Sequence, residues 1–224
     1  NKSNLEVKKI ILKSFSEGTQ LINTKNTETF FKININNNTS NISFFDHSSF
    51  RYSEHFNFGT DILFKDVEKI CSINYKIIDN FLLNEYDQNK KFDDNEFLDK
   101  KYFPKSCYRK IRKKIIIDII NARIDEITNI IFNKNINIQS FKKNNIKTYI
   151  TIKDKSILDK FQLNFSSLFF EASNNELIFI DDFELDSSII NIAGLSNFGW
   201  KKEAIPITQK KNSLITGIFK SIFG

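Results

Sequence analysis

The junction within residues 56–70 constrains the fold of this chain more than any other segment. A strand-like run that begins at Phe56 ends at Gly59, and an amphipathic helical pattern follows immediately. Asp61 is placed to cap this helix. The apolar positions of the helix are Leu63, Phe64, Val67 and Ile70. A strand that passes through one glycine into an amphipathic helix favours a fold in which the helix packs back on a sheet.

The residues before this junction predict a β-hairpin. Apolar residues alternate at Phe31, Ile33 and Ile35. An Asn-rich polar segment, residues 36–40, separates them from a second apolar run, residues 42–45. The predicted order is therefore hairpin, strand, glycine and helix.

The rest of the chain predicts further alternation of helices and strands. A helix is expected around residues 73–82, followed by a polar excursion at residues 86–99. A long helix is expected to open at Pro104 and Ser106 and to end near Asn133. Its buried face is expected to contain Ile116, Ile120, Ile124, Ile127 and Ile131. The segments expected after it are strands at 136–138 and 147–152, a helix capped by Ser156, and a strand at 177–180.

Composition limits the class of protein. The 224 residues, 40% of them hydrophobic, are enough for one domain or two small lobes with a packed core. No run approaches the ~20 apolar residues that span a bilayer, and no secretory leader opens the chain, so we expect a cytoplasmic protein. The sequence contains no Met, which suggests a fragment of a longer chain.

The net charge of +6 is distributed unevenly. Basic residues concentrate in residues 100–114 and 201–211. Two local clusters fit an anionic membrane or an acidic partner better than they fit a nucleic-acid duplex, so we expect no nucleic-acid partner and keep that class as a minor alternative.

The cysteines and histidines have no spacing typical of a metal or redox site. Cys71 and Cys107 are expected to be packing thiols, and His47 and His55 surface or edge residues. No metal site and no catalytic residue are predicted from them.

Four short motifs occur in a fixed order along the chain. They are residues 34–42, with Asn34, Asn36, Asn38 and Ser40; then Gly59, Thr60, Asp66 and Val67; then Arg123, Glu126 and Ile127; and finally Ala193, Gly194 and Leu195. This order resembles the second half of an actin-like ATPase domain, and most of all the bacterial cell-division family FtsA. The resemblance covers nearly the whole chain, and it is based mainly on the order of the four motifs.

The resemblance implies an α/β, actin-like (ribonuclease H-like) second half. It implies a mixed sheet with flanking helices, a small α+β lobe and a C-terminal amphipathic helix. Residues 1–75 and 140–200 would form the actin-like subdomain with the nucleotide-facing loops. The other parts would be a smaller lobe with the long helix at 76–139, a linker at 201–212, and a membrane-targeting helix at 213–224.

The resemblance also implies a nucleotide site, and here the sequence departs from the family. Asn34 and Asn36 stand where the family has the Asp and Gly of its phosphate-binding turn, and Ile152 and Lys153 stand where it has paired glycines. Side chains at such turns block the approach of phosphate to backbone N–H groups. The degenerate nucleotide-facing positions are Asn34, Asn36, Asn38, Ser40, Gly59, Thr60, Asp79, Ile152 and Lys153. The expected cofactor is therefore none, or weakly bound ATP, and residues 36–40 are favoured as a solvated turn.

A cluster of basic residues is a candidate partner site. Arg109, Lys110, Arg112 and Lys113 are expected in the first turns of the long helix, where cations are unfavourable for the helix itself. An acidic peptide would relieve that conflict, and the resemblance implies the acidic C-terminal tail of the tubulin-like FtsZ. The alternative is a solvated basic face paired with Asp99 or Asp118.

The last residues predict an amphipathic helix that lies on a membrane. Pro206 and two lysines precede it, and Asn212 or Ser213 is placed to cap it. Its membrane-binding residues are expected to be Leu214, Ile215, Ile218, Phe219, Lys220, Ile222 and Phe223. The alternative is a terminal helix that docks on its own domain.

Together these features predict a membrane tether for the bacterial division ring. It would link FtsZ filaments to the inner face of the cytoplasmic membrane, associate with itself as an actin-like polymer, and not work as an enzyme. The alternative is an active ATPase of the same superfamily, of the chaperone or sugar-kinase type. A free-standing basic module that binds nucleic acid is a third possibility, and a steep salt dependence of binding would identify it.

Overall fold

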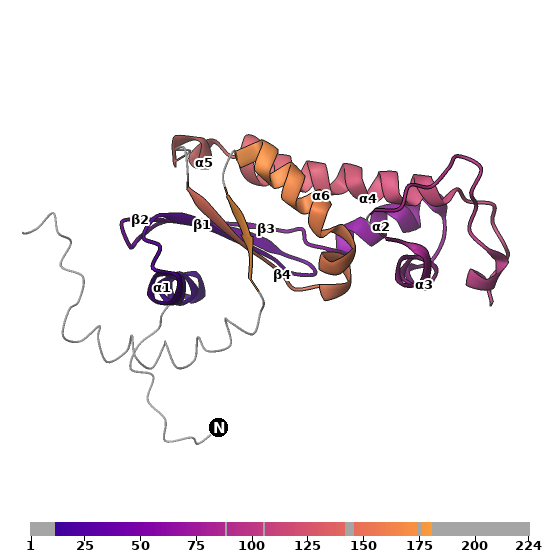
Figure 1. The fold of residues 1–224 in the computed structure, drawn as a ribbon, viewed down its shortest axis with the longest axis horizontal. Helices are drawn as coiled ribbons and strands as arrows, with labels where there is room; N and C mark the ends of the chain where they lie inside the picture. The colour runs from indigo at the N-terminus through magenta and orange to yellow at the C-terminus, as the bar shows by residue number, and fades with distance from the viewer. Residues whose placement is uncertain (1–11, 88, 105, 142–145, 174–175, 181–224) are drawn as a thin grey trace, which may run out of the picture.

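In the part of the chain that the structure describes, a five-stranded mixed sheet forms the centre (Figure 1). The computed structural model describes residues 12–87, 89–104, 106–141, 146–173 and 176–180. The strand order is β3-β2-β1-β4-β5; β1 pairs antiparallel with β2 and parallel with β4. The strands are β1 Phe30–Ile35, β2 Ser40–Asp46, β3 Ser49–Phe56, β4 Lys147–Ile152 and β5 Leu177–Phe179. The sheet and its helices confirm the predicted α/β class.

Helices cover both faces of this sheet (Figure 1). The α-helices are α1 Lys13–Lys25, α2 Asp61–Cys71, α3 Tyr75–Glu85, α4 Lys113–Thr128, α5 Ile136–Phe141 and α6 Lys155–Ser173. A 3-10 turn at Lys100–Tyr102 precedes α4, and a π-helical turn at Asn129–Asn133 extends it. Of the helices that the structure describes, α1 covers one face, while α4 and α6 extend from the other face toward α2 and α3.

Most predicted elements are present. The hairpin of β1 and β2, the strand that leads to Gly59, and the helices α2 and α3 lie where the residue pattern places them. Strand β4 has the predicted bounds, 147–152. The long helix buries its predicted face of isoleucines, because an apolar residue every three or four positions lies on one side of an α-helix.

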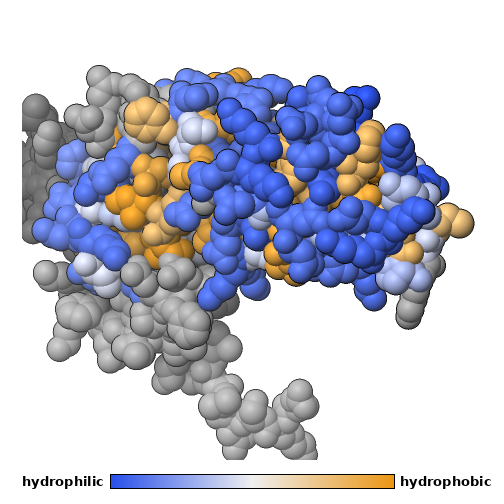
Figure 2. Space-filling view, turned by 45° about the vertical axis from the view of Figure 1, so that its right-hand side comes forward, coloured by the Kyte–Doolittle hydropathy of each residue, from blue (hydrophilic) through white to orange (hydrophobic). Residues whose placement is uncertain are grey.

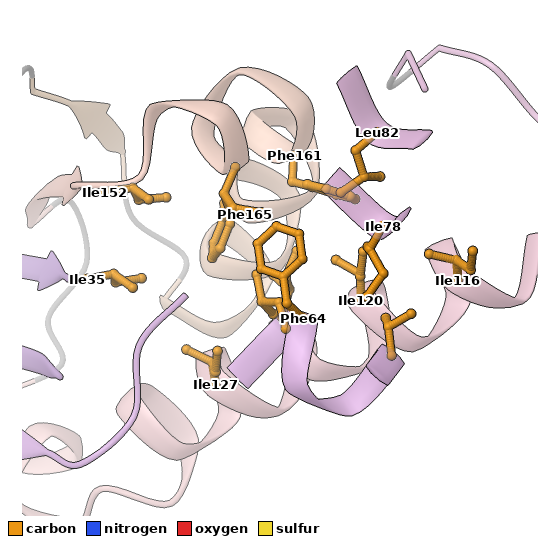
Figure 3. Packing of buried hydrophobic residues seen from close by; sticks show 14 of the residues in the cluster. Ile35, Phe64, Ile78, Leu82, Ile116, Ile120, Ile127, Ile152, Phe161 and Phe165 are labelled. Carbon is orange, nitrogen blue, oxygen red and sulfur yellow. The ribbon is translucent and has the colours of Figure 1, made fainter. Parts of the chain in front are cut away.

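The main hydrophobic core lies between the sheet and α2, α3, α4 and α6 (Figure 3). Ile35 and Ile152 reach it from the ends of neighbouring strands, and Phe64 and Phe165 reach it from α2 and α6. Residues of the smaller lobe expected at 76–139, such as Ile120, belong to the same cluster. One continuous core therefore joins that segment to the sheet.

Two predicted boundaries are wrong. The long helix begins at Lys113 and not at residues 104–106, because the chain before it is extended and pairs with residues 96–98: Leu98 N donates to Ile111 O (2.9 Å) and Lys113 N donates to Glu96 O (2.9 Å). Residues 136–138 are helical in α5 and not a strand. The side chain of Asn135 accepts a hydrogen bond from Ile138 N (3.2 Å), as a helix cap does.

Two helix caps also differ from the prediction. Thr60, and not Asp61, occupies the N-cap position of α2. At the start of α6 it is Asp154, and not Ser156, whose side chain accepts the hydrogen bond from Ile157 N (3.2 Å). Both caps lie within two residues of the predicted one.

The described surface is mostly hydrophilic in the view of Figure 2, with hydrophobic residues gathered in smaller patches. The large apolar side chains that are more than half exposed are Leu12, Ile70, Leu83, Ile136, Leu163 and Phe170. Within the described ranges, no helix combines the length and the hydropathy that crossing a membrane requires. The motif at residues 193–195, the linker and the amphipathic tail lie outside the described residues.

Candidate functional site

The sheet face beneath α1 has a polar end and an apolar end. At the polar end, strand pairing aligns Thr151, Asn34, Asn41 and His55 in one row across β4, β1, β2 and β3. Side chains that are paired directly across strands lie on the same face of a sheet. The four side chains therefore form a polar row at the end of the sheet where β1 turns into β2.

Aromatic residues occupy the opposite end of this face. Phe30 stacks on Phe45, with ring centroids 4.9 Å apart, and meets Tyr149 edge to face at 5.5 Å. α1 packs on this end through Leu21. Gly18 allows the close approach, because a Cβ there would lie 1.9 Å from the ring of Phe45. These contacts fix the position of α1 over the polar row.

A buried ion pair lies between the two ends. Lys32 on β1 is 1% exposed, and its Nζ donates to the Glu17 carboxylate of α1 and to Asn34 Oδ1 (2.7 Å). Asn34 Nδ2 donates to the same oxygen of Glu17 (3.0 Å). Lys13 lies 3.5 Å from the other oxygen of Glu17, on the solvent side. The Glu17 carboxylate thus has cationic neighbours on both sides.

These neighbours determine the protonation of Glu17. Burial by itself would raise the pKa of this carboxyl, but the charge of Lys32 and the hydrogen bonds from Lys32 and Asn34 outweigh it, with a smaller effect from Lys13. The pKa of Glu17 therefore lies below its ordinary value, and the carboxylate is ionised at neutral pH.

A hollow of about 190 Å³ opens beside this ion pair. Its floor is the polar row, and Lys13, Ser14 and Glu17 of α1 line one side. Asn36, Thr39 and Ser40 of the turn between β1 and β2 close its end. Thr151 is 5% exposed, and its Oγ1 has no hydrogen-bond partner among the described residues. The site therefore has a buried hydroxyl available for a ligand.

The turn between β1 and β2 is held from behind by the start of α2. Thr60 N donates to Asn36 O (3.0 Å) and Asp61 N donates to Asn37 O (2.9 Å). Asn36 N closes the turn by donating to Thr39 O (2.9 Å). Ser40 Oγ donates to Phe58 O (2.7 Å) on the same side. The glycine junction therefore serves as the support for this turn.

The predicted nucleotide-facing residues do not all meet at the hollow. Asn34, Asn36 and Ser40 line it, and Gly59 and Thr60 support its turn from behind. The remaining positions lie elsewhere: Asn38 at the exposed tip of the turn, Ile152 in the core on the other face, Lys153 just after β4 and Asp79 on α3. Ile152 turns away from the hollow because successive residues of a strand face opposite sides of the sheet.

Among the site residues that are absent from the sequence-based prediction are Glu17 and Lys32. They are 15 positions apart and come from a helix and a strand, so no local spacing connects them. A lysine between Phe31 and Ile33 in an apolar strand was the available signal, because a buried lysine needs a partner of opposite charge.

The predicted basic cluster divides into two parts. Arg109, Lys110 and Arg112 are exposed and precede α4, so the expectation that they lie in its first turns is wrong. Lys113 does begin the helix, but it is buried and pairs with Glu85 at 2.5 Å. Its charge is therefore used within the protein, and neither Asp99 nor Asp118 is its partner.

Glu85 is the centre of a second charged cluster. Its carboxylate also pairs with Lys101 (2.9 Å) and accepts a hydrogen bond from Tyr102 Oη (2.7 Å). Burial alone would raise the pKa of Glu85, but the hydrogen bonds from Lys113, Lys101 and Tyr102 lower it to about 2. This cluster ties the segment before α4 to the end of α3.

The predicted Arg-x-x-Glu motif also has a structural role. Arg123 on α4 pairs with Asp66 on α2 and, at 2.6 Å, with Glu126 one turn further along α4. The motif therefore fixes the contact between the two helices. Among the residues that the structure describes, no group of three His, Cys, Asp or Glu side chains is placed to hold a metal ion.

The sheet topology and the helices flanking it define the actin-like fold, and solved structures of that class match the chain. MreB5 of Spiroplasma citri bound to ADP matches with a TM-score of 0.55 and 14% identity, over 89% of this chain and 63% of that protein. The form bound to AMPPNP matches with a TM-score of 0.51 and 13% identity, over 83% and 59%. A type IV pilus biogenesis complex of PilM and PilN matches with a TM-score of 0.52 and 9% identity, over 80% and 44%.

These matches show the fold alone. The chain spans 44–63% of the length of these three solved structures. No protein-family profile matches the sequence, and no curated protein matches it. The actin-like fold is therefore confirmed, and the closer resemblance to FtsA stays a prediction.

Proposed function

We propose that this chain is part of an actin-fold scaffold that works by binding and assembly and not by ATP hydrolysis. In this proposal it links an FtsZ-type filament to the inner face of the cytoplasmic membrane and associates with itself as a polymer. The fold supports an assembly role, since similar structures include MreB5 and the PilM–PilN pilus biogenesis complex.

The observation that carries the non-catalytic part of the proposal is the ion pair of Lys32 and Glu17. Actin-like ATPases use carboxylates at this end of the sheet to position a metal ion and water. Here Asn34 is a neutral amide, and Glu17 is already neutralised by a buried ammonium group. These residues do not fit a nucleotide-bound Mg²⁺ ion, which prefers oxygen ligands in near-octahedral geometry. Weak or absent binding of ATP is the expected consequence.

The exposed cations before α4 support the partner assignment. Arg109 and Arg112 are exposed and accessible to an acidic tail, whereas Lys113 is buried and pairs with Glu85. We expect Arg109→Glu combined with Arg112→Glu to weaken binding of an acidic FtsZ-tail peptide at least tenfold in fluorescence anisotropy. Lys65→Glu combined with Lys69→Glu, both exposed on α2, is the control of equal charge change. Unchanged affinity in the double variant would remove this partner site.

The membrane assignment depends on the tail, and flotation with anionic liposomes tests it. The intact chain is compared with one truncated before Asn212. We expect the intact chain to float and the truncated chain to remain at the bottom of the gradient. Ile218→Glu should abolish flotation, while Thr216→Glu, on the polar side of the predicted helix, should reduce it less. Equal flotation of all four chains would rule out the tail as the anchor.

The alternative, an active ATPase, is favoured by one observation: Glu17 is a carboxylate that lines the hollow. Turnover of ATP by the intact chain is measured by phosphate release. Turnover that Glu17→Gln abolishes would establish the enzyme and contradict the scaffold proposal. Absence of turnover in the presence of Mg²⁺ is the result we expect.

A further inference from the structure

We infer that the hollow beneath α1 binds a phosphate-type oxyanion without a metal ion. Lys32 already supplies the positive charge that balances the Glu17 carboxylate, so a metal ion is not needed there. The inference rests on the proposed function in treating the hollow as a site that binds without catalysis. Its test is separate from the tests of membrane binding and of turnover.

The charges and dipoles at the hollow favour an anion. Lys13 and Glu17 line the hollow, and Lys32, which is buried beside it, pairs with Glu17, so the three charges sum to +1. Lys13 and Ser14 form the first turn of α1, where free backbone N–H groups attract anions. In the described structure, Leu12 at the N-cap position gives this helix no side-chain cap. A bound oxyanion would supply the missing acceptor.

A second and independent observation is the hydroxyl of Thr151. Its side chain lines the hollow, is 5% exposed and finds no partner among the described residues. A buried hydroxyl without a hydrogen bond is unfavourable, and a ligand oxygen would satisfy it. Asn41, whose Nδ2 makes a long hydrogen bond to Ser14 Oγ (3.4 Å), lies in the same row. The hollow therefore offers amide and hydroxyl groups in addition to charge.

The size of the hollow limits the ligand. Its volume of about 190 Å³ is below the ~300–1,000 Å³ of sites that enclose drug-sized molecules. A phosphate or pyrophosphate group fits this volume class, either as a free ion or as the end of a larger molecule.

The same side chains argue against a metal ion. A divalent cation would need the Glu17 carboxylate, whose Oε2 already accepts from Lys32 and Asn34. Lys32 is buried in the sheet and would repel a second cation at the same oxygen. Any oxyanion affinity of this site should therefore be independent of Mg²⁺.

Calorimetric titration of the intact chain with inorganic pyrophosphate tests the inference, once with Mg²⁺ and once with EDTA. We expect measurable binding in EDTA and no gain in affinity with Mg²⁺, which lowers the apparent affinity only as far as it complexes free pyrophosphate. Affinity at least tenfold higher with Mg²⁺, or no binding in either buffer, would overturn the inference. Neither result affects the flotation experiment, so the titration tests this inference and flotation tests the membrane-tether proposal independently.

A pair of threonines on β4 provides a matched control. Thr151→Val removes the hydroxyl in the hollow. Thr148→Val removes another buried hydroxyl, which has no hydrogen-bond partner among the described residues and faces away from the hollow on the same strand. We expect Thr151→Val to weaken pyrophosphate binding about tenfold and Thr148→Val to leave it unchanged, since a hydrogen bond to a charged group has this magnitude. Equal effects of both variants would show that binding does not occur in the hollow.

Discussion

Gly59 lies directly against the backbone carbonyl of Asn36, so that a Cβ at position 59 would be 2.0 Å from the carbonyl oxygen and 2.5 Å from that of Asn37. The neighbour that would have to move is backbone, and the backbone is held there by Thr60 N and Asp61 N. The glycine is therefore required for close approach of the β1–β2 turn to α2.

We expect Gly59→Ala to destabilise the protein by ~1–3 kcal/mol, the usual cost of overpacking. The free energy of unfolding in urea measures this. Asn57→Ala, at an exposed position two residues earlier, should change it by less than ~0.5 kcal/mol. If the two variants are equally stable, the turn does not depend on the glycine.

The ion pair beneath α1 should behave as a coupled unit. Lys32→Met leaves the Glu17 charge without its buried partner, so we expect a loss of ~3–5 kcal/mol. Adding Glu17→Gln to Lys32→Met should recover most of that loss, because no buried charge remains. Urea unfolding of both single variants and the double variant gives the coupling energy. Additive single effects would contradict a direct interaction.

The cluster around Glu85 should make stability depend on pH. The folded-state pKa of Glu85 is lowered from 4.5 to about 2, so its contribution is complete above pH 4.5 and is lost as the pH falls toward 2. We expect Glu85→Gln to be less stable than the unmodified chain at pH 7 and the difference to shrink between pH 4.5 and 2. Glu171→Gln, exposed on α6, is the control. A difference that is constant with pH would contradict this assignment.

Asn74 caps α3 by accepting a hydrogen bond from Ile77 N (3.2 Å). Asn74→Ala should cost ~0.5–2 kcal/mol, and Asn74→Asp should restore most of it, because Asp is an equally good cap. Thermal unfolding of the two variants measures this difference. Equal losses in both variants would show that the side-chain hydrogen bond contributes nothing.

The sequence pattern correctly predicted the strands and helices in which the buried residues recur with the period of a strand or of a helix. Alternation at Phe31, Ile33 and Ile35 places these residues in the core because β1 lies on the surface that α2 and α4 cover. The isoleucines of α4 follow the same logic at helical spacing. In both elements, these apolar residues lie on one face and pack against a single hydrophobic core.

The wrong predictions have identifiable physical causes. Ile136 and Ile138 alternate like strand residues, yet Ile136 is 84% exposed in α5 and only Ile138 is buried. The predicted start of α4 is wrong because the backbone of residues 111–113 forms hydrogen bonds with residues 96–98 and stays extended. The residue types that mark the start of a helix give no information about this pairing. Both errors arise from distant parts of the chain, which override local preference.

The candidate site was predicted only in part, for the same reason. The turn at Asn36 was visible because Asn-rich segments favour turns. The polar row, in contrast, takes Thr151 and His55 from strands that are distant in sequence, and it exists only through their register. Local sequence patterns do not show which residues of distant strands are paired with one another.

The separation of charge from aromatic rings on the α1 side of the sheet also has a consequence for folding. If β1 slid by two residues during assembly, Lys32 would take the place of Phe30, opposite Phe45 and Lys147. An ammonium group would then be buried beside a second lysine and away from its partner Glu17. Because this misaligned pairing is far less favourable than the native one, the Lys32–Glu17 contact selects the correct alignment of the strands before any ligand is present.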